Sequence, residues 1–170
     1  MLRLAKAFWD IAIARRSPAQ LPASVFLLCL MAIVVAVLEV LGALLPPISG
    51  RIFTRVALSA GLPLLFAWTV LAIARQRQRF LQTGTALLGV AALAQVVSYP
   101  ISSLLNFVGN ERPASIPLVL LLLVVFAWYL LAGANIWRAA LNSGMALGFL
   151  VSGIYLLLQM ALEQLLLQEP

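Results

Sequence analysis

The sequence predicts an all-α fold: a polytopic integral membrane protein with five transmembrane helices, preceded by an interfacial amphipathic helix. Hydrophobic residues occupy 64% of the 170 positions and charged residues only 9%. A soluble domain of this size needs more charged side chains than this to cover its surface. In hydrocarbon only helices and closed barrels satisfy the backbone. The apolar runs are long and uninterrupted, without the ten-residue alternation of barrel strands, and they therefore favour helices.

Residues 1–22 are predicted to form a cytoplasmic lead-in that contains the amphipathic helix. Arg3, Lys6 and Asp10 fall on one helical face, whereas Phe8 and Ile11 fall on another. Separate polar and apolar faces are typical of a helix that lies in the membrane interface. The stretch 17–22 contains two prolines, which end this helix before the chain enters the membrane.

Residues 23–170 are predicted to form the transmembrane domain, with crossings at about 24–45, 52–74, 80–105, 117–139 and 143–167. Each run is long enough for a helix that crosses a bilayer, which takes about 20 residues. The first crossing stops at Pro46, and the fourth begins at Pro117. Pro63 and Pro100 lie inside the second and third crossings. Membrane helices tolerate such prolines as kinks when neighbouring groups satisfy the freed carbonyl, so we expect kinks at both positions.

The distribution of Lys and Arg predicts the orientation. With the N-terminus inside, the cytoplasmic segments carry eight cations and the external segments carry three. Cytoplasmic loops are enriched in Lys and Arg. We therefore expect the N-terminus inside and the C-terminus outside. The short, Arg-punctuated and alanine-rich sequence is typical of a bacterial protein, so we expect a multi-pass protein of a bacterial inner membrane with a cytoplasmic N-terminus and a periplasmic C-terminus. The cations lie beside apolar runs, which makes anionic lipid headgroups at the cytoplasmic face the predicted partners, and not nucleic acid.

The most informative pattern lies in the fifth crossing, where small and polar residues recur every three or four positions. They share one helical face, and they are Gly144, Gly148, Ser152, Tyr155 and Gln159, followed by Glu163. Small residues at this spacing let another helix approach closely. The ridge is predicted either to pack inside the five-helix bundle or to dock another membrane protein, or a second copy of this chain.

Glu39 is the acid that the sequence places well inside a crossing. Its helical neighbours are small, so we expect its side chain to point into the bundle. A carboxylate at this depth is costly. We expect it to be neutralised by protonation or paired with Arg51 or Arg55, and the alternative is a proton or cation site.

A further polar stripe follows the third crossing and continues into the fourth. Its members are Gln95, Ser98, Ser102, Asn106 and Asn135. Amides and hydroxyls inside membrane helices usually form hydrogen bonds to another helix. The stripe is therefore predicted to hold the helices together, and the alternative is that it lines a small hydrated path.

The residue types present favour a non-enzymatic protein. The chain has no His and a single Cys, Cys29, which removes Ser-His-Asp and Cys-His pairs and the commonest metal ligands. We therefore predict no catalytic residues, no metal site and no cofactor.

The layout resembles the Yip family of small polytopic membrane proteins, in particular its bacterial members. The resemblance rests on Phe8-Trp9-Asp10-Ile11, on Arg15-Arg16-Ser17-Pro18 and on the five apolar runs. It implies a cytoplasmic lead-in, five crossings and an external C-terminus. Eukaryotic members are associated with vesicle traffic and with prenylated Rab GTPases. This chain lacks their acidic, glycine-containing cytoplasmic signature, and GTPase binding is not implied.

Two functions are compatible with these features. The first is a scaffold or accessory subunit that packs against other membrane proteins through its small and polar helix faces. The second is a small transporter or channel component with a polar path through Glu39, Gln95, Asn135 and Gln159. The first is our prediction from the sequence, and the second is its alternative.

Overall fold

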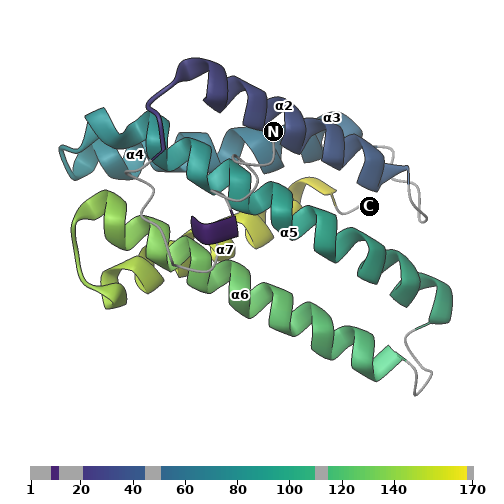
Figure 1. Ribbon diagram of the computed structural model, residues 1–170. Helices are drawn as coiled ribbons and strands as arrows, with labels where there is room; N and C mark the ends of the chain where they lie inside the picture. The colour runs from purple at the N-terminus through teal and green to yellow at the C-terminus, as the bar shows by residue number, and fades with distance from the viewer. Residues whose placement is uncertain (1–8, 12–20, 45–50, 110–114, 168–170) are drawn as a thin grey trace.

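The computed structural model describes residues 9–11, 21–44, 51–109 and 115–167, and these residues form helices and short connections without any strand (Figure 1). Five helical segments are long and apolar enough to cross a membrane, and a short helical stretch at 9–11 precedes them. The predicted all-α fold with five membrane-length helices is therefore confirmed. Residues 1–8, with Arg3 and Lys6, and residues 12–20 of the lead-in lie outside the described residues, as do 45–50, 110–114 and 168–170.

The crossings follow the predicted runs closely. The first is α2 (Val25–Ala43), and the second consists of α3 (Ile52–Val56), η2 (Ala57–Gly61) and α4 (Leu62–Ile73). A short turn, η3 (Arg77–Arg79), leads into α5 (Phe80–Val108), which is followed by α6 (Ser115–Leu141) and α7 (Met145–Leu167). Ser24 caps α2, because its side-chain oxygen accepts a hydrogen bond from the backbone N–H of Leu27 at 3.4 Å.

The second crossing is irregular where the sequence places Pro63. Proline has no N–H, and its ring conflicts with the carbonyl four residues earlier in an α-helix. Here the wider π-helical turn η2 ends two residues before Pro63, and the N–H of Leu62 bonds to the carbonyl of Ala57, five residues back. Pro100 behaves differently: α5 continues through it to Val108 and ends at Gly109, whose φ is +81°.

One end of the bundle is closely packed. The buried residues of α5 lie between Thr83 and Ala92, and those of α6, apart from Ser115, lie between Ala132 and Ala140. Trp137 is 1% exposed and meets Phe66 edge-to-face, with ring centroids 5.6 Å apart. This region, residues 83–92 of α5 and 132–140 of α6, is called the packed end.

Arg79 closes the packed end. Its guanidinium donates hydrogen bonds to the carbonyls of Ala139 at 2.8 Å and Ala140 at 3.1 Å. These carbonyls belong to the last turn of α6, where backbone acceptors lack intrahelical partners and a cation is favoured. One of the basic side chains expected at the cytoplasmic face therefore also caps a helix.

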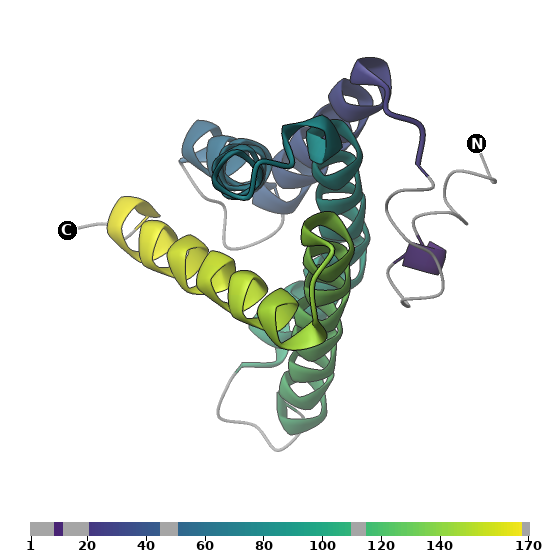
Figure 2. The same cartoon turned by 90° about the vertical axis from the view of Figure 1, so that its left-hand side faces the viewer.

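The opposite half of the bundle is more open. Residues 116–131 of α6 include no buried residue. Helices α6 and α7 meet at a turn in which Asn142 has a φ of +51°, and from there α7 leaves α6 at an angle (Figure 2). Near its C-terminal end α7 reaches the second crossing, where the Arg51 side chain donates to the carbonyl of Leu166. The diagonal course of α7 leaves space between α5, α6 and α7.

Candidate ligand cavity

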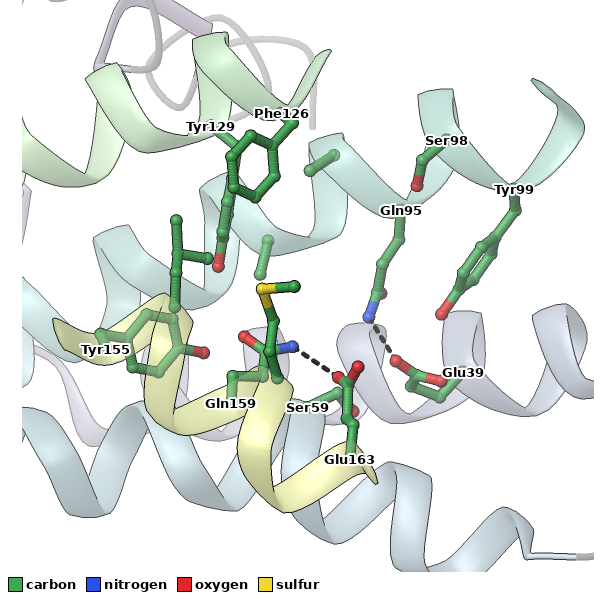
Figure 3. A pocket seen from close by; sticks show the side chains of 14 residues that line it. Glu39, Ser59, Gln95, Ser98, Tyr99, Phe126, Tyr129, Tyr155, Gln159 and Glu163 are labelled. Carbon is green, nitrogen blue, oxygen red and sulfur yellow. Dashed lines mark hydrogen bonds between the residues drawn. The ribbon is translucent and has the colours of Figure 1, made fainter. Parts of the chain in front are cut away.

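A cavity of about 410 Å³ occupies this open half of the bundle. Side chains from α2, η2, α5, α6 and α7 line it (Figure 3). Its polar members are Glu39, Ser59, Gln95, Ser98, Tyr99, Tyr129, Tyr155, Gln159 and Glu163. Five segments far apart in the sequence therefore bring two carboxyl groups, two amides and several hydroxyls to one place.

Glu39 lies on α2 and faces α5. Its Oε1 accepts a hydrogen bond from Gln95 Nε2 at 2.9 Å, and the hydroxyl of Tyr99 points toward the same carboxyl group (Figure 3). Gln95 and Tyr99 are four residues apart and so share a face of α5. Gly42 makes room for the Tyr99 ring, because a Cβ at Gly42 would lie only 2.8 Å from Tyr99 Cδ2. The small neighbours of Glu39 therefore admit the groups that hold it.

Glu163 provides the second carboxyl group, from α7. Its Oε1 accepts a hydrogen bond from Gln159 Nε2, one turn earlier, at 2.9 Å. Each acid of the cavity therefore accepts a hydrogen bond from the amide of a glutamine. The bond to Glu39 joins α5 to α2, whereas the bond to Glu163 lies within α7.

The two arginines proposed as partners of Glu39 take different places. Arg51 donates to the carbonyl of Leu166 near the end of α7. Arg55 lines a second cavity of about 200 Å³ together with Glu39, Tyr99 and Glu163. Of the two predicted partners, Arg55 is thus the one that shares a cavity with Glu39.

Three buried polar atoms at this site have no hydrogen-bond partner. They are Gln95 Oε1, Gln159 Oε1 and Arg55 Nε. Leaving a buried polar group unsatisfied usually costs about 1–3 kcal/mol. Two of the three are acceptors on the glutamines that hold the acids, and an N–H or O–H donor in the cavity would satisfy them.

The charged groups of the site lie near the ends of their own helices. Glu39 is four residues from the end of α2, Glu163 is four residues from the end of α7, and Arg55 is three residues after the start of α3. At a rise of 1.5 Å per residue, these groups lie about 6 Å inside the helix ends. Gln95, which binds Glu39, lies 13 residues before the end of α5, and Tyr129 lies 14 residues after the start of α6. The cavity therefore reaches the middle of these two longer helices.

The small-residue ridge of α7 packs inside the bundle. A Cβ at Gly148 would overlap the carbonyl oxygen of Ala134 and would come within 3.2 Å of the Arg138 nitrogen. Ser152 Oγ donates to the Leu130 carbonyl at 3.4 Å. Gly144 is exposed and has nothing near its Cβ position. Gly148 and Ser152 therefore pack against α6, which corresponds to the first alternative for this ridge, packing inside the bundle.

The other predicted site residues divide between the two halves of the bundle. Tyr155 and Gln159, one and two turns after Ser152, line the cavity, as do Gln95 and Ser98. Asn135 is 3% exposed within the packed end, and it is not among the lining residues. Ser102 and Asn106 lie further along α5 toward its exposed end. The proposed path through Asn135 therefore does not coincide with this cavity.

Sequence reasoning missed Ser59, Tyr99 and Tyr129 as site residues. Tyr99 lies one turn after Gln95, so the helical period that identified the polar stripe also contained this residue. Ser59 carried no comparable signal, because its position depends on how η2 faces the cavity. Glu163 was recognised on the α7 face, but its convergence with Glu39 requires the diagonal course of α7.

Acceptors outnumber donors among the unpartnered and acidic groups of the site. Among its buried atoms without a partner, the site has two amide oxygens and one donor, Arg55 Nε, and two carboxyl groups add further acceptors. The hydroxyl groups of the cavity can act as donor or acceptor. Within the part of the chain that the structure describes, no group of three or more His, Cys, Asp or Glu side chains could hold a metal ion. The arrangement suits a positively charged group with several N–H donors.

Comparison with protein families, curated proteins and solved structures finds no match for this chain. The resemblance to the Yip family therefore stays a prediction. Fold and site together define a multi-pass helical membrane protein with a polar cavity between its helices.

Proposed function

We propose that this protein is a ligand-binding component of a membrane transport system, and that its cavity receives an ammonium group. The observation that carries the proposal is the pair of glutamine-held carboxyl groups, Glu39 and Glu163, beside two unpartnered amide oxygens. Ionisable residues at membrane depth are rare and usually functional. A primary ammonium group offers three N–H donors to acceptors that the protein itself leaves partly unsatisfied.

This proposal develops the second of the two functions derived from the sequence. The accessory-subunit role was suggested by the small-residue face of α7, and the packing of Gly148 and Ser152 against α6 gives that face an internal use. A scaffold or accessory role in the membrane stays a prediction without a surface assigned to it.

We also propose a setting for the protein. The excess of Lys and Arg at 1–16, 75–79 and 138 supports a cytoplasmic location for the packed end of the bundle and an inner-membrane location for the protein. Glu39 and Glu163 then lie in the periplasmic half of the membrane. Anionic lipid headgroups are the proposed neighbours of the arginines at the cytoplasmic face.

A thermal unfolding experiment in mild detergent tests the ammonium proposal. A ligand that binds only the folded state raises the melting temperature. Ethanolamine hydrochloride should raise it more than the same concentration of choline chloride, because the quaternary ammonium of choline has no N–H to donate. The double variant Glu39→Gln/Glu163→Gln keeps oxygen acceptors for both glutamine amides but removes the charge, and it should lose the difference.

The control is Glu169→Gln, which changes an acid outside the described residues and should behave as wild type. Equal effects of ethanolamine and choline on the wild type would overturn the proposal. A double variant that still distinguishes the two compounds would overturn it as well.

A further inference from the structure

An apolar groove lies beside the polar cavity. It has a volume of about 570 Å³ and is lined by side chains of α5, the exposed half of α6 and α7. Five residues line both spaces, and they are Ala94, Ser98, Phe126, Tyr129 and Met160. Figure 3 shows Phe126 and Tyr129 on α6 at one side of the cavity and Glu39 at the other. The groove and the cavity are therefore level with each other, and a molecule held in the cavity has apolar space beside it.

The charged groups of the site leave one charge to be balanced. Glu39 and Glu163 contribute two negative charges when both are ionised, and Arg55, which lines the adjoining cavity with both acids, contributes one positive charge. Charges removed from water are costly unless they are paired. A ligand with a single ammonium group completes the balance, and its N–H donors can satisfy the unpartnered oxygens of Gln95 and Gln159.

The order of the two spaces along the helices does not suit a membrane lipid. Gln95, which binds Glu39, lies 13 residues before the end of α5, or about 20 Å along the helix. The groove extends along α6 from Tyr129 to Val119, toward the start of that helix and away from the packed end. A lipid keeps its headgroup at the interface and its chains at the centre of the bilayer, which is the reverse of this order. A small amine has no fixed orientation in the membrane and is free of this conflict.

The walls of the groove specify the rest of the ligand. Apart from Ser98 and the Tyr129 hydroxyl they are apolar, and Phe126 and Met160 are 46% and 50% exposed. An apolar substituent covers these surfaces, whereas a second charge in the groove is costly. We infer that the cavity and groove together bind a small primary monoamine with an apolar substituent, its ammonium at the two acids and its substituent beside Phe126 and Tyr129. This inference rests on the proposed ammonium site and names the class of molecule that carries the ammonium.

The substituent is tested by isothermal titration calorimetry of the protein in mild detergent at neutral pH, with the heat of each amine added to protein-free micelles subtracted. Hexylamine has two more methylenes than butylamine and should bind about tenfold more tightly, because each fully buried methylene raises affinity roughly fourfold. 1,6-Diaminohexane has the same carbon chain but brings a second ammonium into the groove, and it should bind about tenfold more weakly than hexylamine. Glu39→Gln/Glu163→Gln should lose most of the hexylamine binding.

The groove is tested with two matched leucines of α6. Leu123 is 57% exposed and lines the groove, whereas Leu120 is 56% exposed and does not. Leu123→Trp fills the groove and should weaken hexylamine binding several-fold, while the response to ethanolamine, which occupies only the polar cavity, should stay that of the wild type. Leu120→Trp adds the same ring outside the groove and should bind both amines as the wild type does.

The outcomes separate this inference from the proposed function. If ethanolamine stabilises the protein selectively but hexylamine binds no more tightly than butylamine, the ammonium site stands and the groove does not receive the substituent. Equal affinities of the wild type for hexylamine and 1,6-diaminohexane, or of Leu123→Trp and Leu120→Trp for hexylamine, would also overturn the inferred binding mode. If the double variant binds hexylamine as the wild type does, the two acids do not hold the ammonium and both proposals fail.

Discussion

The contact between α6 and α7 provides the sharpest prediction about stability. At Gly148, an added Cβ would overlap the Ala134 carbonyl oxygen and lie 3.1 Å from its carbonyl carbon. These are backbone atoms, so the clash is relieved only if the two helices separate. Gly148→Ala should therefore lower the free energy of unfolding by about 1–3 kcal/mol, the usual cost of overpacking a well-packed site.

Gly153 is the matched control on the same helix. It has nothing within 4 Å of its Cβ position, so Gly153→Ala meets no obstacle. Replacing a helical glycine by alanine is itself favourable by about 0.5–1 kcal/mol, and both variants share this gain. The difference between them therefore measures the steric effect at Gly148 alone.

Reversible unfolding in mixed micelles, with sodium dodecyl sulfate titrated into a mild detergent, gives the free energies. Helical circular dichroism follows the transition. Gly148→Leu should destabilise more than Gly148→Ala, and Leu157→Ile, at a side chain that is 69% exposed, should change little. Equal free energies of unfolding for Gly148→Ala and Gly153→Ala would refute the close approach of α6 and α7.

Two further predictions concern the ends of the bundle. Arg79→Ala removes the donor for two terminal carbonyls of α6 and should destabilise the protein by about 1–3 kcal/mol in the same assay, whereas Gln78→Ala, at an exposed position, should have little effect. For orientation, a periplasm-specific enzyme reporter fused to the C-terminal end of the chain should be active, and a cytoplasm-specific fluorescent reporter there should be dark. The opposite pair of signals would contradict the inside location of the N-terminus.

The sequence was sufficient for the elements and for much of the polar pattern. A backbone in hydrocarbon must form its hydrogen bonds within each segment, so long apolar runs predict helices without reference to their neighbours. Pro63 lacks an N–H wherever it is placed, and it predicted the irregular second crossing. Residues that share a face of one helix also follow from its period, as Gly148 and Ser152 do.

Tertiary structure decided which of these faces meet. Glu39 and Glu163 are 124 positions apart in the sequence, and nothing local brings them together. They line one cavity because Gly148 lets α7 approach α6 closely at one end, from which α7 crosses to the second crossing. The course of α7 also gives Arg51 and Arg55 different partners: Arg51 donates to a carbonyl near the end of α7, whereas Arg55 lines a cavity with Glu39 and Glu163. Helical period is a property of each segment, whereas the direction in which a helix crosses its neighbours depends on packing between segments distant in the chain.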